Sequence, residues 1–345
     1  MKLSIGILAH NEERLIGRTI GSLLGQTVVR DGAIEKEIIV VANGCADGTV
    51  EAARAALGSV RPEWRCRSEV RDVYEPGKAN AWNVFVHEAS AADSDFLVLL
   101  DADIEFATDD AIARLLAHLE ASPEVAIAPD QPVKKFEGAG PTALLIRAMQ
   151  KTGSDGDSAL SGQLYAAHAD ALRAVVMPRG VVVEDGFLRG MVLTRGFSAP
   201  EDVSRIRRAP GVRHYYAPYE TLSAIYRYER RQAAGTTINR FLFQEVSNWR
   251  RQGLDPSGEI RRRNREQPDW LEALIADRLK TAGIVSTPKN YVLRRMRKGE
   301  NWTAKRLLKA PLIAAAIVFD FVVALDASRQ LRDRTRGVRW DAIRQ

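Results

Sequence analysis

Two carboxylates, one residue apart, follow an apolar run in the segment FLVLLDADIEF, residues 96–106. Side chains of a strand alternate between its two faces, so Asp101 and Asp103 would point the same way if the strand continues through them. Like charges held this close repel each other unless they are solvated or a cation lies between them. Carboxylates are hard oxygen ligands suited to Mn²⁺ or Mg²⁺ bound together with a diphosphate. The motif therefore predicts either a solvated pair or a metal–diphosphate site.

Two other apolar runs lead into polar segments nearer the N-terminus. Asn11 and Glu12 follow the run at 2–9, which closes with Ala9, and Asn43 closes the run at 36–43. If these runs are neighbouring parallel strands, their carboxyl ends lie at one edge of a sheet, where ligands of such folds bind. We therefore expect these polar residues and the Asp101–Asp103 pair to form one site.

Strand and helix signals alternate through the first part of the chain. Apolar runs at 2–9, 36–43, 66–73, 95–103 and 124–131 alternate with helical spacing at 12–26, 50–57, 77–90 and 109–122. This alternation predicts an α/β fold whose central sheet is mostly parallel and has helices on both faces. Farther along, VVV at 181–183 predicts another strand that leads into Glu184 and Asp185, and the chain is helical and arginine-rich from about 222 onward.

The two halves of the chain differ in charge. Residues 1–200 contain 20 Lys and Arg against 28 Asp and Glu, whereas residues 201–345 contain 30 against 16. A basic half favours contact with phosphates, nucleic acid or an anionic membrane, although solvated arginines would give the same composition. Only Cys45 and Cys66 are present, too few for a disulfide framework, so we expect a reducing, cytoplasmic compartment.

The C-terminal region contains the longest apolar stretch of the sequence. That stretch, 311–325, is shorter than the ~20 residues of a spanning helix and contains Asp320. Seven Lys and Arg surround Trp302 in the preceding segment, 294–309. We expect 294–325 to lie on an anionic membrane surface, the inner face of the cytoplasmic membrane, or else to pack as a helix on the rest of the protein.

Five motifs in order resemble those of the inverting, GT-A-fold glycosyltransferases of glycosyltransferase family 2. They are ILAHNEERLIGRTIGSLLGQ, VANGCADGT, GKANAWN, LLDADIEF and VVVEDGFL, and the resemblance covers about residues 2–235. It implies a GT-A-like domain at 1–235 followed by a helical, basic region at 236–345. The implied reaction is transfer of a sugar from a nucleotide-diphosphate sugar to a saccharide or lipid-linked acceptor hydroxyl, in envelope glycan or glycolipid synthesis.

The resemblance also implies which residues bind the donor. The nucleotide-binding positions are Ala9, Asn11, Glu12, Asn43, Lys78 and Asp101. Asp103, with Asp101, would hold Mn²⁺ or Mg²⁺, and Lys78 would approach the nucleotide or its diphosphate. Ala42 replaces the usual aspartate that contacts uracil, so UDP is expected while the identity of the base stays open.

The same resemblance assigns the catalytic and acceptor positions. Asp185 would be the general base that takes the proton of the acceptor hydroxyl. Glu184 would face away from it if the segment is extended. Weaker assignments for the acceptor or diphosphate are Gly162, Tyr165, Glu184, Arg227 and Arg230.

Two other functions fit parts of this sequence. A nucleotidyltransferase can use a similar sheet, but it normally has a glycine-rich basic loop after the first strand, where this chain has AHNEE. A basic nucleic-acid-binding protein with a degenerate enzyme domain would interleave aromatic and basic residues on a sheet face. Because the basic residues here follow arginine-rich helical patterns, we expect no nucleic-acid partner.

Overall fold

The computed structural model of the chain describes residues 1–136, 156–219, 221–294 and 310–334. Most of the basic segment predicted to approach a membrane, residues 295–309, lies outside the described residues.

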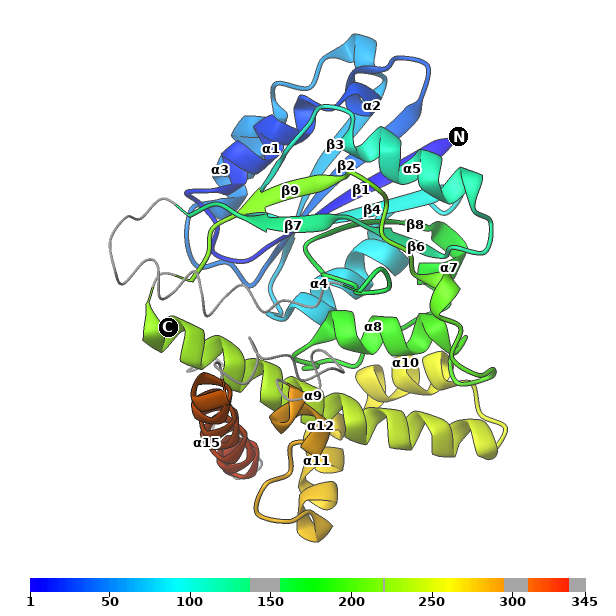
Figure 1. The fold of residues 1–345 in the computed structure, drawn as a ribbon. Coiled ribbons are helices and arrows are strands. Elements are labelled where there is room, and N and C mark those ends of the chain that lie inside the picture. Colours follow the sequence, from blue (N-terminus) through cyan, green and yellow to red (C-terminus); the bar gives the residue numbers. More distant parts are fainter. Residues whose placement is uncertain (137–155, 220, 295–309, 335–345) are drawn as a thin grey trace.

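A six-stranded sheet forms the centre of the molecule, in the order β3-β2-β1-β4-β8-β6 (Figure 1). Its strands are β1 (Lys2–Ala9), β2 (Glu35–Asn43), β3 (Cys66–Val73), β4 (Phe96–Asp101), β6 (Ile127–Pro129) and β8 (Leu164–His168). Strands β3, β2, β1 and β4 are mutually parallel, and β8 runs antiparallel to both β4 and β6. The predicted α/β fold with a mostly parallel sheet is confirmed.

A second sheet of three strands adjoins the first, in the order β5-β9-β7. It contains β5 (Ile104–Phe106), β7 (Gln131–Lys134) and β9 (Arg213–Tyr216). Strand β5 begins one residue after Asp103, so the turn between β4 and β5 connects the two sheets.

Helices cover both faces of the central sheet because its strands are apolar on both faces. In β1, Ile5 and Ile7 pack into the core beneath one group of helices, and Leu8 packs into the core on the opposite face. The first group contains α1 (Ile16–Leu24), α2 (Thr27–Arg30), α3 (Thr49–Leu57) and α5 (Ala111–Ala121). The second contains α4 (Lys78–Val84), the π-helical turn Phe85–Ala89, α7 (Ala169–Arg173) and α8 (Glu184–Leu193).

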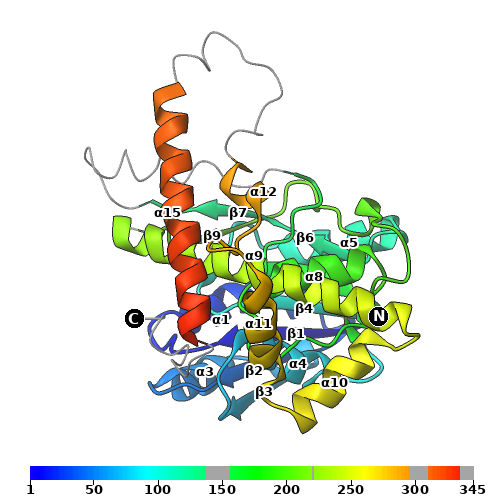
Figure 2. The ribbon, with the colours of Figure 1, turned by 90° about the horizontal axis from the view of Figure 1, so that it is seen from below.

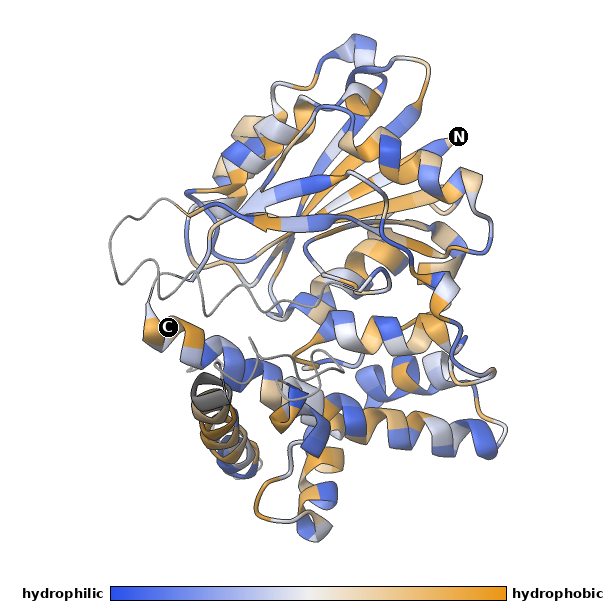
Figure 3. Ribbon diagram, viewed as in Figure 1, coloured by the Kyte–Doolittle hydropathy of each residue, from blue (hydrophilic) through white to orange (hydrophobic). Residues whose placement is uncertain are grey.

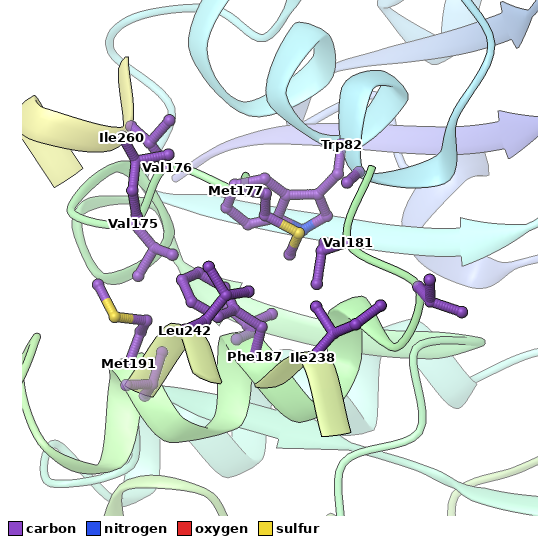
Figure 4. Packing of buried hydrophobic residues seen from close by; sticks show 14 of the residues in the cluster. Trp82, Val175, Val176, Met177, Val181, Phe187, Met191, Ile238, Leu242 and Ile260 are labelled. Atoms are coloured by element: carbon purple, nitrogen blue, oxygen red, sulfur yellow. The ribbon is translucent and has the colours of Figure 1, made fainter. Parts of the chain in front are cut away.

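Further helices extend the structure beyond α8 (Figure 1). These are α9 (Leu222–Arg251), α10 (Pro256–Glu266), α11 (Trp270–Thr281), α12 (Lys289–Val292) and α15 (Ala310–Arg334). Helix α9 shares a core with the sheet layer: Ile238 and Leu242 of α9 lie close to Phe187 of α8, with Trp82 of α4 nearby (Figure 4). The boundary predicted at 235 falls inside α9, and the division into two domains stays a prediction.

Helix α15 lies across α9 and extends along the outside of the molecule (Figure 2). Asp326 of α15 accepts hydrogen bonds from Tyr226 (2.8 Å) and Arg230 (3.2 Å) of α9. Asp320 is fully buried and pairs with Arg294 at 3.1 Å. Much of α15 is apolar (Figure 3), yet no helix among the described residues is long and apolar enough to cross a membrane.

Three predicted strands differ from the structure. The run predicted at 124–131 is divided between β6 and β7, which belong to different sheets. The strand predicted at 95–103 ends at Asp101, because Ala102 and Asp103 form a turn into the second sheet. Residues 181–183 form no strand, and α8 begins directly after them at Glu184.

Candidate active site

The carboxyl ends of β1, β2 and β4 lie side by side at one edge of the central sheet. Ala9 pairs with Ala42 across β1 and β2, and Leu8 pairs with Asp101 across β1 and β4. Parallel pairing therefore gathers the three polar segments that are separate in the sequence, as ligand sites of such sheets require.

Hydrogen bonds join the loop after β1 to the loop after β2. The Asn11 side chain accepts a hydrogen bond from the Ala46 amide at 2.8 Å, and the Glu12 amide donates to the Thr49 hydroxyl at 2.7 Å. Asn11 has a left-handed backbone, with φ of 55°, which asparagine tolerates better than most residues. Together these bonds give the proposed nucleotide edge a defined shape.

The other two positions predicted at this edge are buried. Ala9 is 2% exposed and Asn43 is 2% exposed. The side-chain oxygen of Asn43 is buried without a hydrogen-bond partner among the described residues. A buried polar atom of this kind is rare in folded proteins unless water or a ligand pairs with it.

Lys78 is the centre of the charged cluster at the end of β4. Its ammonium nitrogen lies 2.7 Å from Asp101 Oδ1, 3.0 Å from Glu184 Oε1 and 3.3 Å from the carbonyl oxygen of Gly162, to which it donates. Burial disfavours the charge on Lys78, but Asp101 and Glu184 outweigh burial and raise the pKa of the ammonium above its ordinary value. Lys78 is therefore the cation that neutralises Asp101.

Asp103 has different surroundings from Asp101. No hydrogen bond or ion pair joins its carboxylate to any residue that the structure describes, and its negative charge adds to the burial that raises the pKa of Tyr216 to about 12. Because the strand ends at Asp101, the predicted alternation of faces does not extend to Asp103. The two aspartates are thus inequivalent: Asp101 is neutralised by Lys78, whereas Asp103 is the carboxylate left for a cation.

Glu184 and Asp185 form the first turn of α8. The prediction that they face opposite ways assumed an extended backbone, which these two residues do not have. Burial opposes ionisation of Glu184, but Lys78 and Arg231 prevail and hold its pKa below the ordinary value. Burial and the charge of Glu184 raise the pKa of Asp185 to about 6. Adjacent carboxyl groups whose pKa values are separated in this way take different roles, and Asp185 is the one suited to proton transfer near neutral pH.

Gly162 lies where the charged side chains meet. A β-carbon added at this residue would lie 3.3 Å from Glu184 Oε1, 3.4 Å from Asp185 Cβ and 3.5 Å from Lys78 Nζ. The absence of a side chain therefore leaves space beside the proposed base.

Tyr165 is placed differently from its prediction. It is 2% exposed in β8, and its hydroxyl accepts a hydrogen bond from the Trp82 indole at 2.7 Å. Its position in the core argues against the acceptor contact predicted for it.

The two arginines predicted on α9, Arg227 and Arg230, form no hydrogen bond or ion pair with the carboxylates around Lys78 in the described part of the chain. Arg230 pairs with Asp326 of α15 at 3.2 Å, and Arg227 is exposed. Arg231, the next residue along α9, acts together with Lys78 in lowering the pKa of Glu184, and it donates to the carbonyl oxygen of Val182 at 3.2 Å. One residue along a helix rotates the side chain by about 100°, which is enough to exchange one face for another.

Divalent metal could be held here only with help from a ligand. Within the described ranges, no group of three or more His, Cys, Asp or Glu side chains is arranged to hold a metal ion. Asp103, whose carboxylate has no hydrogen-bond or ion-pair partner in the described part of the chain, fits a magnesium- or manganese-type ion that takes its remaining oxygens from a diphosphate and water.

Residues 4–154 match the family model described as Glycosyl transferase family 2. The predicted resemblance to glycosyltransferase family 2 is confirmed. No curated protein matches the chain.

One solved glycosyltransferase shares the fold, and two other solved structures are less similar. The mannosyltransferase PcManGT from Pyrobaculum calidifontis, in complex with GDP-Man and Mn²⁺, is 18% identical with a TM-score of 0.55, and the match covers 98% of this chain and 87% of that chain. TarS 1–349 from S. aureus is 15% identical with a TM-score of 0.48, covering 99% and 93%. Glucosyl-3-phosphoglycerate synthase from Mycobacterium tuberculosis is 19% identical with a TM-score of 0.44, covering 73% and 80%.

The family 2 motifs did not identify the face of α9 that lies beside this site. Tyr228, Arg231, Gly235 and Asn239 are spaced by three or four residues, so they share one face of the helix. The Tyr228 ring lies 4.9 Å from the ring of Tyr219, and burial together with Tyr219, Glu229 and Asp185 raises the pKa of Tyr228 above its ordinary value. Helical spacing groups these residues on one face, but the sequence does not indicate which face of α9 turns toward the site, because packing sets the rotation of the helix.

Proposed function

We propose that this protein is an inverting glycosyltransferase that moves a sugar from a nucleotide-diphosphate sugar to an acceptor hydroxyl. The observation that carries the proposal is the gathering of Asp101, Glu184 and Asp185 around Lys78, at the carboxyl edge of a sheet whose sequence matches family 2. The family match gives no support to a nucleotidyltransferase or to a nucleic-acid-binding protein.

Asp185 is the proposed general base. The acceptor oxygen forms a bond to the anomeric carbon as that carbon's bond to the diphosphate breaks, and the hydroxyl proton passes to the carboxylate of Asp185. The Gly186 amide donates to this carboxylate at 2.7 Å and fixes its orientation. A carboxyl group with a pKa of about 6 is ionised at neutral pH and yet basic enough to accept a proton.

The nucleotide is proposed to bind against the loops after β1 and β2, near Asn11, Glu12 and Asn43. UDP is the expected nucleotide because of the family resemblance. Buried Ala42 stands in place of the aspartate on which that expectation depends, and the PcManGT complex contains GDP-Man. The nucleotide preference therefore has to be determined by binding measurements.

A divalent ion, Mn²⁺ or Mg²⁺, is proposed to bind at Asp103. Among the described residues, four carboxylates (Asp101, Asp103, Glu184 and Asp185) face two cations (Lys78 and Arg231) here, which leaves an excess of negative charge. A bound divalent ion would offset this excess and stabilise the charge that develops on the leaving diphosphate. Lys78 pairs with Asp101 at 2.7 Å and holds its carboxylate in place, although burial still raises the pKa of Asp101 above its ordinary value.

The test is calorimetric titration of the purified protein with UDP, GDP, CDP and dTDP, each with and without Mn²⁺. We expect one nucleotide to bind in a metal-dependent manner, and Asp103→Asn to weaken that binding at least tenfold, about 1.4 kcal/mol. Asp277→Asn removes a carboxylate that is 71% exposed on α11 and should leave the binding unchanged. Binding of no nucleotide, or equal binding by Asp103→Asn, would overturn the proposal.

The acceptor is proposed to be a saccharide or lipid-linked hydroxyl compound that the enzyme meets at a cytoplasmic membrane surface. Helix α15 supports this part, because Val318, Phe321 and Val322 are 63%, 49% and 47% exposed on one side of it. Arg329, which is exposed farther along the helix, would face anionic headgroups. A helix that lies in the interface needs only such a one-sided apolar surface.

A further inference from the structure

A groove of about 760 Å³ lies between α8, α9 and α11, apart from the carboxylate cluster around Lys78. Three arginines from two helices line it: Arg240 and Arg251 of α9, and Arg278 of α11. None of the described residues that line it is acidic, although Glu245 pairs with Arg278 at 2.7 Å. Arg240 and Arg251 therefore make the groove a concave surface of positive charge, the form that anion-binding sites take.

Several polar atoms of the groove are buried without partners. The Nε atoms of Arg240 and Arg278 and the Oδ1 atom of Asn239 have no hydrogen-bond partner among the described residues. Asn239 is only 6% exposed, and it too lines the groove. Buried donors and acceptors are nearly always paired in folded proteins, so a polar ligand or water is expected here.

The arginines keep part of their hydrogen-bonding capacity for a ligand. Arg240 donates one hydrogen bond, 2.9 Å long, to the carbonyl oxygen of Ser286, and Arg278 donates at 2.7 Å to Glu245. A guanidinium has five N–H donors in a planar fork, which matches the oxygens of a phosphate or carboxylate. Arg251 is exposed at the rim and pairs with Asn248.

The groove ends against the turn that carries the proposed base. Val183 and Gly186, which flank Glu184 and Asp185, form part of its wall. Asn239 donates to the carbonyl oxygen of Val183 at 2.9 Å, so a single side chain contacts both the groove and the catalytic turn. A ligand in the groove would therefore lie beside the residues that act on the acceptor.

We propose that this groove binds an anionic group of the acceptor, a phosphate carried on the saccharide or its linker, and thereby positions the acceptor hydroxyl toward Asp185. The assignment of the bound anion to the acceptor rests on the proposed function. The anion site itself rests on the arginines and the unpaired buried atoms. A free phosphate would use the same contacts, and the ligand pair in the test separates the two sources.

The experiment is calorimetric titration of the full-length protein with inorganic phosphate, glucose 6-phosphate and glucose. We expect phosphate and glucose 6-phosphate to bind, glucose not to bind, and glucose 6-phosphate to bind more tightly than phosphate because the sugar adds contacts. Arg251→Met should weaken glucose 6-phosphate at least about tenfold, the loss expected for one charge-assisted hydrogen bond. Arg54→Met, an exposed arginine of α3, is the matched control and should change nothing.

Two further variants keep the outcomes distinct. Arg240→Lys retains the charge but not the fork, so it should also weaken binding even though Arg240 is partly buried. Asp103→Asn should abolish metal-dependent nucleotide binding and leave glucose 6-phosphate binding intact. Equal binding of phosphate and glucose 6-phosphate would reduce the groove to a free-anion site and overturn its acceptor role. If the unsubstituted protein binds neither phosphate nor glucose 6-phosphate, or if both arginine variants bind them unchanged, the groove is not an anion site. If the unsubstituted protein binds glucose 6-phosphate but no nucleotide, the proposed glycosyltransferase activity is overturned and the anion site is not.

Discussion

Replacing Asp185 by asparagine should abolish sugar transfer and yet make the folded protein more stable. Burial and the neighbouring Glu184 charge raise the pKa of Asp185 from 3.8 to about 6, so the ionised carboxylate is unfavourable in the folded state. At 1.36 kcal/mol per pKa unit, this difference corresponds to at most about 3 kcal/mol of destabilisation above pH 6. Asparagine has no charge, and its side-chain oxygen can still accept the Gly186 amide hydrogen bond.

The sign of the effect follows from proton binding. Between about pH 6 and 3.8 the folded state holds a proton on Asp185 that the unfolded state has lost, so the penalty diminishes as pH falls. It should be near its full value at pH 8, about half of that at pH 5, and absent below 3.8. The transfer rate of the unsubstituted enzyme should conversely rise about tenfold per pH unit up to about pH 6 and then level off.

The assay is urea unfolding of the unsubstituted protein and Asp185→Asn at pH 8 and pH 5. The midpoint should be higher for the variant at pH 8, and its advantage should be smaller at pH 5. Asp277→Asn, at a carboxylate that is 71% exposed, is the control and should stay within about 0.5 kcal/mol of the unsubstituted protein at both pH values. A variant that is less stable at pH 8, or an advantage that does not depend on pH, would refute the reasoning.

Three other substitutions test the packing and charges around the site. Gly235→Ala should reduce the free energy of unfolding by about 1–3 kcal/mol and lower kcat, since its β-carbon would lie 2.1 Å from a Val183 methyl group; Gly21→Ala, where nothing lies within 4 Å, should instead stabilise by up to about 1 kcal/mol in urea unfolding. Lys78→Met should reduce the free energy of urea unfolding by about 3 kcal/mol, because it removes the cation that pairs with partly buried Asp101 and with buried Glu184, and an unchanged midpoint would contradict these ion pairs. Phe321→Glu should reduce sedimentation with vesicles that contain anionic lipid, whereas Ile284→Glu, at an apolar residue that is 77% exposed, should not; equal sedimentation of both variants would contradict the membrane role of α15.

Local patterns were sufficient for the strands of the parallel sheet. The runs predicted at 2–9 and 66–73 coincide with β1 and β3, and the run predicted at 36–43 begins one residue after β2 does. A strand that is buried on both faces needs a nearly continuous apolar sequence, and a short window of residues records that requirement. The adjacent pairing of β1, β2 and β3 is the one that short connections of alternating strands and helices favour, whereas β4 pairs with β1 on the other side.

Local patterns failed where long-range pairing decides the backbone. Asp103 leaves β4 because the next residues pair with β9, whose sequence is more than a hundred residues away. Arg231, and not Arg230, meets Glu184 because the rotation of α9 is set by packing of Gly235 and Ile238 against α8 and the sheet layer. Neither choice has a signal in the residues immediately around it.

Local sequence was enough to identify which residue types could do the chemistry and to place Asp101 near the end of a strand. It placed Asp101, Asp103 and Asp185 in an order typical of family 2, because covalent spacing and strand periodicity are properties of the chain. Only the tertiary structure decided that Lys78 neutralises Asp101 and that Asp185 has a pKa of about 6. Both depend on burial and on charges from distant segments, since removal of water and the distance between charges are set by packing.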